Sequence, residues 1–75
     1  MKLRDIQLNK NKILRISKDT VNGVTFYQLR YWTRDNQENA YKPTEKVIAF
    51  HVDKLDEILL SLIHSSVDNQ NIIPN

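Results

Sequence analysis

The sequence predicts an α+β fold in which four antiparallel β-strands are followed by one C-terminal α-helix. Up to residue 52, apolar stretches rich in β-branched and aromatic residues alternate with turn-forming residues, which is typical of strands. After residue 53 the apolar residues recur at helical spacing. The chain has 75 residues and no cysteine, so it must stabilise one small domain without disulfides, most simply by oligomerisation.

The strands are expected at 6–8, 12–17, 24–34 and 45–52. Asn22-Gly23 contains the only glycine of the chain and supplies the positive φ angles of a tight hairpin turn between the second and third strands. Residues 35–40 form a polar loop. Pro43 has no amide hydrogen to donate, which places residues 41–43 in a loop or at the edge of the sheet.

The third strand alternates imperfectly. Val24 and Phe26 are apolar at even positions, whereas Leu29 and Tyr31 are apolar at odd positions. A β-bulge near residues 27–28 would reconcile the two halves, because one inserted residue reverses the facing of the side chains. The alternative is a strand that is buried on both faces at its start.

A helix is expected from Lys54 to about Ser65. The residue that caps its start is either Asp53, which is followed by Asp56 three residues later as in a capping box, or His51. Most of its apolar residues fill an arc of about 140° at 100° per residue, and Leu60 lies outside this arc. A helix that covers one small sheet needs a narrower apolar stripe than this. The additional apolar residues therefore indicate either that the helix also packs against a second copy of the chain or that it is a wide core helix in a monomer. The predicted dimer-interface residues are Leu55, Ile58, Leu59, Leu60, Leu62 and Ile63.

We therefore expect one sheet-plus-helix domain over residues 1–65 and a flexible tail over residues 66–75, which lacks any period. No segment reaches the length of a transmembrane helix, and the first residues do not lead into the apolar region of a signal peptide. The expected location is intracellular: cytoplasmic or nucleoid-associated, or nuclear in a eukaryote.

The charge of the chain is unevenly distributed. Residues 1–51 carry ten Lys or Arg against five acids, a net charge of +5, whereas residues 53–75 carry a net charge of −3. This asymmetry indicates an anionic partner for the sheet. Two histidines without cysteine disfavour a metal site, and no pattern of nucleophile and base supports an enzyme. No cofactor is expected.

The residues Arg30, Trp32 and Arg34 would share one face of the third strand, with Leu29 and Tyr31 on the other. Guanidinium groups on both sides of the only indole can hold phosphates while the ring stacks on a base, which is typical of single-strand binding. The alternative is a core tryptophan that closes the sheet edge. Charged neighbours disfavour that alternative, because unpaired charges are rarely buried.

In its order of elements, the chain resembles the transcriptional coactivator positive cofactor 4 family. The resemblance covers about residues 6–63, and its most specific parts are Tyr31-Trp32, Lys42-Pro43, Lys46 and Ile48-Ala49-Phe50 before the helix. It implies a homodimer in which each subunit has a curved four-stranded antiparallel sheet and one helix. The helices contribute to the dimer interface, and the sheets bind single-stranded or melted DNA.

The family tryptophan corresponds to Trp32, its strand arginine to Arg30, and its basic residue before the last strand to Lys46. An early strand lysine corresponds to Lys12 or Lys10. The chain departs from the family in the first hairpin, where an aromatic residue and lysines that contact DNA in the eukaryotic member are matched by Val21, Asn22 and Val24. A stand-alone bacterial or phage member fits the chain better than a coactivator.

The sequence therefore predicts a non-enzymatic, largely sequence-independent single-stranded DNA-binding homodimer that acts in replication, recombination or transcription. Lys46 on the last strand would complete a groove with the Arg30–Trp32 strand. Two alternatives stay open: a small dimeric module that binds transcription or replication proteins, and RNA binding by the same stacking. The predicted nucleic-acid contacts are Trp32, Arg30, Lys46, Lys12, Lys10, Arg34, Lys42 and Arg15.

Overall fold

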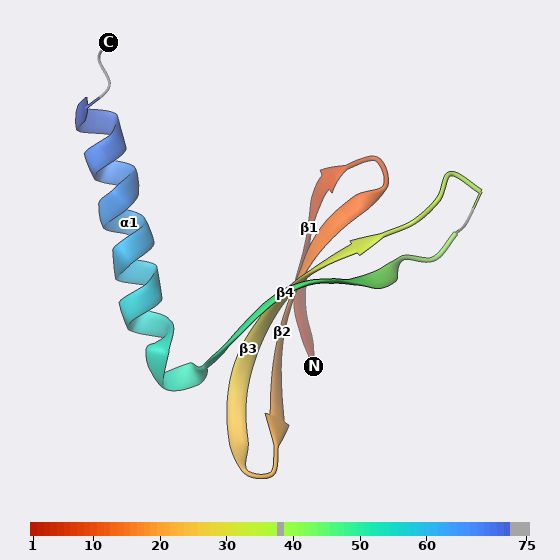
Figure 1. Ribbon diagram of the computed structural model, residues 1–75, viewed down its shortest axis with the longest axis horizontal. Coiled ribbons are helices and arrows are strands. Elements are labelled where there is room, and N and C mark those ends of the chain that lie inside the picture. Colours follow the sequence, from red (N-terminus) through yellow and green to blue (C-terminus); the bar gives the residue numbers. More distant parts are fainter. Residues whose placement is uncertain (38, 73–75) are drawn as a thin grey trace.

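The computed structural model describes residues 1–37 and 39–72, and side chains as far as residue 65. Four strands form one antiparallel sheet in the order β1-β2-β3-β4. Their bounds are β1 Lys2–Asn9, β2 Lys12–Val21, β3 Val24–Thr33 and β4 Lys42–His51. A 3-10 turn, η1 (Val52–Lys54), leads into the helix α1 (Leu55–Ile72). The predicted fold class is confirmed, and Figure 1 shows the strong twist of the sheet.

The predicted hairpin turn is confirmed. Val21 pairs with Val24, which leaves a two-residue loop in which Asn22 has φ 53° and Gly23 has φ 80°. Both residues tolerate left-handed backbone better than others do, so the sequence meets the requirement of this turn. Pro43 lies on the edge strand β4, as predicted, although β4 begins three residues earlier than expected.

The predicted bulge near residues 27–28 is wrong. The pairing of β3 with β2 runs without a shift from Val24 to Thr33, and its pairing with β4 runs without a shift from Phe26 to Arg30. The strand instead has half-buried residues on both faces. Phe26 is half-buried and pairs with His51, next to η1, whereas Tyr27 packs against Phe50 on the other face, with ring centroids 5.7 Å apart.

The start and the end of the helix differ from the prediction. Asp53 lies inside η1 and does not cap the helix. His51 is the N-cap residue of η1, as the second alternative expected, but its side chain makes no capping hydrogen bond. The helix continues through Ile72, beyond the predicted end near Ser65. The flexibility of residues 66–75 stays a prediction, and residues 73–75 lie outside the described residues.

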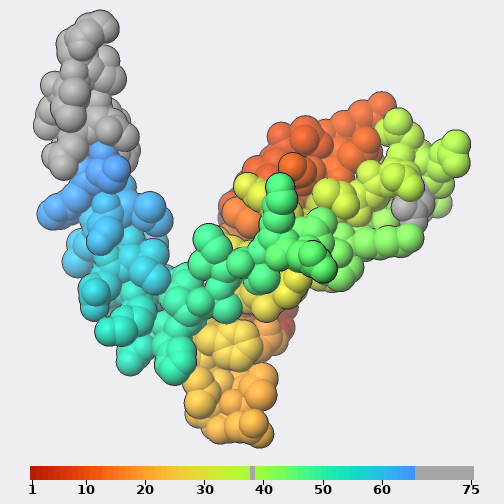
Figure 2. Space-filling model, viewed as in Figure 1, coloured from red at the N-terminus to blue at the C-terminus, as the bar shows by residue number. Residues whose placement is uncertain are grey.

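The helix does not cover its own sheet. Figures 1 and 2 show that it leaves the end of β4 and stands away from the strands over most of its length. Leu55 and Ile58 are half-buried near η1, but Leu59, Leu60, Leu62 and Ile63 are exposed. The alternative of a wide core helix within one subunit is therefore wrong.

The hydrophobic core of one chain is very small. Among residues 1–37 and 39–65, Ile13 is the one buried hydrophobic residue, at 3% exposure. A domain that buries so little apolar surface lacks the main favourable contribution to folding. One chain therefore leaves apolar side chains of its sheet and of its helix exposed, Ile48 and Leu62 among them.

Candidate nucleic-acid interface

The strand register assigns the predicted residues to two faces, because directly paired residues of an antiparallel sheet lie on the same face. Trp32 pairs with Ile13 and Arg30 pairs with Arg15, so these four residues share one face, here called the tryptophan face. Leu29 and Tyr31 pair with Ile16 and Leu14 on the opposite face. The predicted alternation of Arg30 and Trp32 against Leu29 and Tyr31 is confirmed.

Three side chains contact one another at the centre of the tryptophan face: Trp32, Arg15 and Asp5. The Arg15 guanidinium lies over the Trp32 ring, 4.1 Å from its centroid. Its Nε and Nη2 donate to the two carboxylate oxygens of Asp5 at 2.8 and 3.0 Å. Asp5 reaches Arg15 because it pairs with it directly across β1 and β2. One face of the indole is therefore already covered by a fixed cation.

Arg30 and Arg34 hydrogen-bond to backbone carbonyl groups. Arg30 Nη1 donates to the carbonyl of Thr44, at the place where residues 44–46 of β4 stand opposite Tyr31 alone. The Thr44 hydroxyl donates to the Tyr31 carbonyl at 2.8 Å, which holds this irregular segment on β3. Within the described residues, these contacts leave the positive charge of Arg30 without a carboxylate partner.

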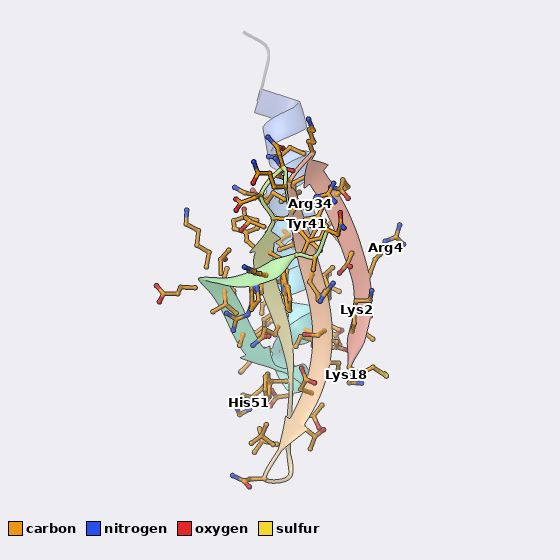
Figure 3. The ribbon with its side chains drawn as sticks, turned by 90° about the vertical axis from the view of Figure 1, so that its right-hand side faces the viewer. Lys2, Arg4, Lys18, Arg34, Tyr41 and His51 are labelled. Carbon is orange, nitrogen blue, oxygen red and sulfur yellow. The ribbon has the colours of Figure 1, made fainter. Side chains whose placement is uncertain are left out.

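A second aromatic–guanidinium pair lies at the end of the sheet where the β1–β2 turn meets the β3–β4 loop. Arg34 lies over the Tyr41 ring, 5.1 Å from its centroid, and Figure 3 shows the two side chains next to each other. The Tyr41 hydroxyl accepts a hydrogen bond from Gln7 at 3.0 Å, and Arg34 Nη2 donates to the carbonyl of Lys10 at 3.4 Å. These contacts fix Tyr41 beside the tryptophan face.

The predicted lysines do not join this group. Lys12 pairs with Thr33 and lies over the Tyr31 ring, 5.0 Å from its centroid, on the face opposite Trp32. Lys46 borders an apolar hollow with Leu14, Leu29 and Tyr31 on that same face. The face opposite Trp32 is here called the lysine face. It also carries Lys18, which pairs with Tyr27, and Lys42, which pairs with Thr33. The groove that was to join Lys46 to Trp32 therefore does not form within one chain, and Lys10 lies in the β1–β2 turn.

Asp5, Gln7 and Thr44 were missed by the sequence analysis. Each acts through a partner on another strand, so its position follows from the strand register and not from a local motif. Tyr41 carried a detectable signal, because it is an aromatic residue placed next to Lys42-Pro43 on the edge strand.

The Asp5–Arg15 pair changes how both groups bind protons. The hydrogen bonds from Arg15 hold the pKa of the Asp5 carboxyl below its usual value, although partial burial acts in the opposite direction. The same bonds raise the pKa of Arg15. A carboxyl whose pKa is lowered by folding stabilises the folded state above its unfolded pKa, and this contribution is lost as the pH falls through the folded value.

We therefore expect Asp5→Asn to lower the free energy of unfolding near neutral pH and to have a shrinking effect below about pH 4. Urea unfolding of both proteins at pH 7 and at pH 3 measures this difference. A difference that is equal at the two pH values would contradict the stabilising role of the ion pair.

The described residues contain no group of three or more His, Cys, Asp or Glu that could hold a metal ion. Within the same part of the chain, no helix is long and apolar enough to cross a membrane. The tryptophan face carries an indole and guanidinium groups, which can stack on planar groups and attract anions.

Solved structures with the same fold are homologues of the transcription coactivator PC4. One from Burkholderia pseudomallei, in a tetragonal crystal form, has a TM-score of 0.78 at 21% identity, covering 88% of this chain and 96% of that chain. Its orthorhombic form has a TM-score of 0.77 at 21% identity, covering 88% of each chain. No family model matches the sequence, and no curated protein does.

A third structure is the bacteriophage T5 homologue of PC4, which is described as implicated in recombination-dependent DNA replication. It has a TM-score of 0.55 at 17% identity, covering 91% of this chain and 78% of that chain. The chain therefore has a PC4-like fold, which confirms the resemblance to positive cofactor 4 at the level of the fold. Its structural neighbours come from a bacterium and a phage, as the sequence favoured.

Proposed function

We propose that this chain is a non-enzymatic single-stranded DNA-binding protein that acts as a homodimer on melted DNA in replication, recombination or transcription. The observation that carries the proposal is the tryptophan face. It gathers a stacked indole and the guanidinium groups of Arg15 and Arg30 on one side of a rigid sheet. Stacking surfaces combined with cations bind single strands with little regard to sequence, because every base offers a π-face.

The positions of the charges support a nucleic-acid partner. Arg30 carries no carboxylate partner within the described residues, and Arg34, which follows the end of β3, donates to a backbone carbonyl. Arginine suits both demands of a single strand, since its planar group contacts phosphate through two donors and also stacks on bases. The T5 homologue, which shares the fold, supports DNA as the partner and replication or recombination as the process.

The dimer is supported by the apolar surface that one chain leaves uncovered. Ile48 on the lysine face is 68% exposed and Leu62 on the helix is 63% exposed. A second copy can cover the sheet with its helix while its own sheet receives the first helix, which is a self-complementary two-fold arrangement. Charge supports the same contact, because Asp56 and Glu57 begin the helix and Lys18 and Lys46 lie on the lysine face.

A salt-titrated competition tests the proposed function. Labelled oligo-dT bound to the protein is challenged with unlabelled single-stranded DNA, duplex DNA or RNA of equal length. We expect single-stranded DNA to compete best, and the logarithm of the binding constant to fall linearly with the logarithm of salt concentration. Equal competition by RNA would favour the RNA-binding alternative. Absence of oligo-dT binding at low salt would overturn the proposal.

A further inference from the structure

A base that approaches Trp32 meets the Arg15 guanidinium first, because Arg15 lies over the indole and is hydrogen-bonded to Asp5. Arg15 covers the indole at 4.1 Å from its centroid, so the nearest accessible layer at this point is the guanidinium. Asp5 occupies its Nε and Nη2, and a quarter of the Arg15 side chain stays exposed. The other two arginines of the face donate to carbonyl groups, and within the described residues neither has a carboxylate partner.

We propose that Asp5 is a positioning residue that holds the Arg15 guanidinium over Trp32, so that the guanidinium receives a nucleobase and does not contact a phosphate. This inference rests on the single-strand binding proposed above and adds that the arginines of the site have different roles. Arg15 forms a stacking surface together with Trp32, whereas Arg30 and Arg34 provide charge for the phosphates.

Two physical arguments support this division. A carboxylate at 2.8 Å cancels much of the attraction that Arg15 could offer to a phosphate, and it occupies the Nε–Nη2 edge, one of the edges through which a guanidinium binds a phosphate by two hydrogen bonds. A base that stacked directly on Trp32 would have to break both the ion pair and the cation–π contact. A base that stacks on the guanidinium keeps both contacts, and guanidinium planes are established stacking partners of bases.

The slope of binding against salt separates the two roles of Arg15, because each phosphate contact on a single strand contributes about −0.7 to it. We compare oligo-dT binding by the wild type, Arg15→Gln, Asp5→Asn and the double variant, using anisotropy of a labelled oligonucleotide. Arg15→Gln should weaken binding about fivefold or more at every salt concentration, as expected for a lost stacking partner, and leave the slope unchanged.

Asp5→Asn frees the Arg15 guanidinium and also the Lys2 ammonium, which donates to Asp5 Oδ2 at 3.3 Å. The slope of Asp5→Asn should therefore be steeper than that of the wild type, and the double variant should lose about 0.7 of this increase, which is the share of Arg15. Glu45→Gln is the matched control, since it removes one exposed acid from β4 that makes no contact with Arg15. Its slope should stay at the wild-type value, which shows that loss of an acid alone does not steepen the slope.

Arg15→Lys keeps the positive charge and removes the plane, and it provides a test that does not require Asp5 to be changed. We expect it to bind as weakly as Arg15→Gln, with circular dichroism showing that both variants are folded. If Arg15→Gln flattens the slope by about 0.7, or Arg15→Lys binds like the wild type, Arg15 is a phosphate contact and the inference is wrong while single-strand binding stands. If the wild type itself fails to bind, the proposed function is what fails.

Discussion

Replacing Trp32 by alanine should weaken the binding of oligo-dT by about 1–3 kcal/mol, which is roughly 5- to 150-fold in Kd. The indole is the support on which Arg15 lies, and Asp5 in turn is hydrogen-bonded to Arg15. Its loss therefore removes the ring and leaves the guanidinium without a defined plane. The measurement is the anisotropy of a labelled oligonucleotide, since the variant lacks the intrinsic tryptophan signal.

Trp32→Phe is the control for this prediction. It keeps an aromatic ring under Arg15 and should retain most of the affinity that alanine loses, because a smaller ring still presents a π-face. Since Trp32 is half-buried beside Ile13, the folded state of both variants is checked by circular dichroism. A folded Trp32→Ala that binds as tightly as the wild type would remove Trp32 from the site.

Replacing Leu62 by glutamate should convert the dimer to a monomer. Leu62 is 63% exposed in one chain and lies near the centre of the apolar side of the helix. Burying a leucine contributes about 1.5–3 kcal/mol and a two-fold interface contains it twice, so we expect the dimer dissociation constant to rise by at least about 100-fold. Sedimentation over a range of concentrations measures this constant.

Ser61→Glu is the matched control, because it introduces the same charge on the polar side of the same helix, one turn after Glu57 and one turn before Ser65. It should leave the dimer intact. The account of the helix fails if the wild type is a monomer at micromolar concentration, or if Leu62→Glu remains as dimeric as the control. The monomeric variant should also be less stable, since each chain buries so little apolar surface on its own.

Local sequence signals were sufficient for much of the fold. Asn22-Gly23 determines its turn because the backbone there has positive φ, a property of the residues themselves. The alternation of Arg30 and Trp32 likewise follows from the period of any strand. The continuation of the helix from Ser65 to Ile72 could not be predicted in this way, because this segment is mostly polar and carries no apolar period.

The site was harder to predict because it depends on how the strands are paired. Asp5 meets Arg15 only in the observed register of β1 against β2, which contains shifts on both sides of this pair. Lys46 lies two residues before Ile48 and so shares its face. That this face is opposite Trp32 follows from the pairing of Val47 with Arg30 across β3 and β4. Register of this kind is set by long-range packing, which a single sequence does not reveal.

We propose that the tryptophan face binds single strands while the lysine face lies between two copies of the chain. Nuclear magnetic resonance of the protein titrated with oligo-dT tests it most directly. We expect the indole Nε1–H of Trp32 and the Nε–H of Arg15 to shift during the titration, while the methyl groups of Leu14 and Ile48 stay unchanged. Shifts confined to Leu14 and Ile48, with the Trp32 and Arg15 signals unmoved, would contradict the account.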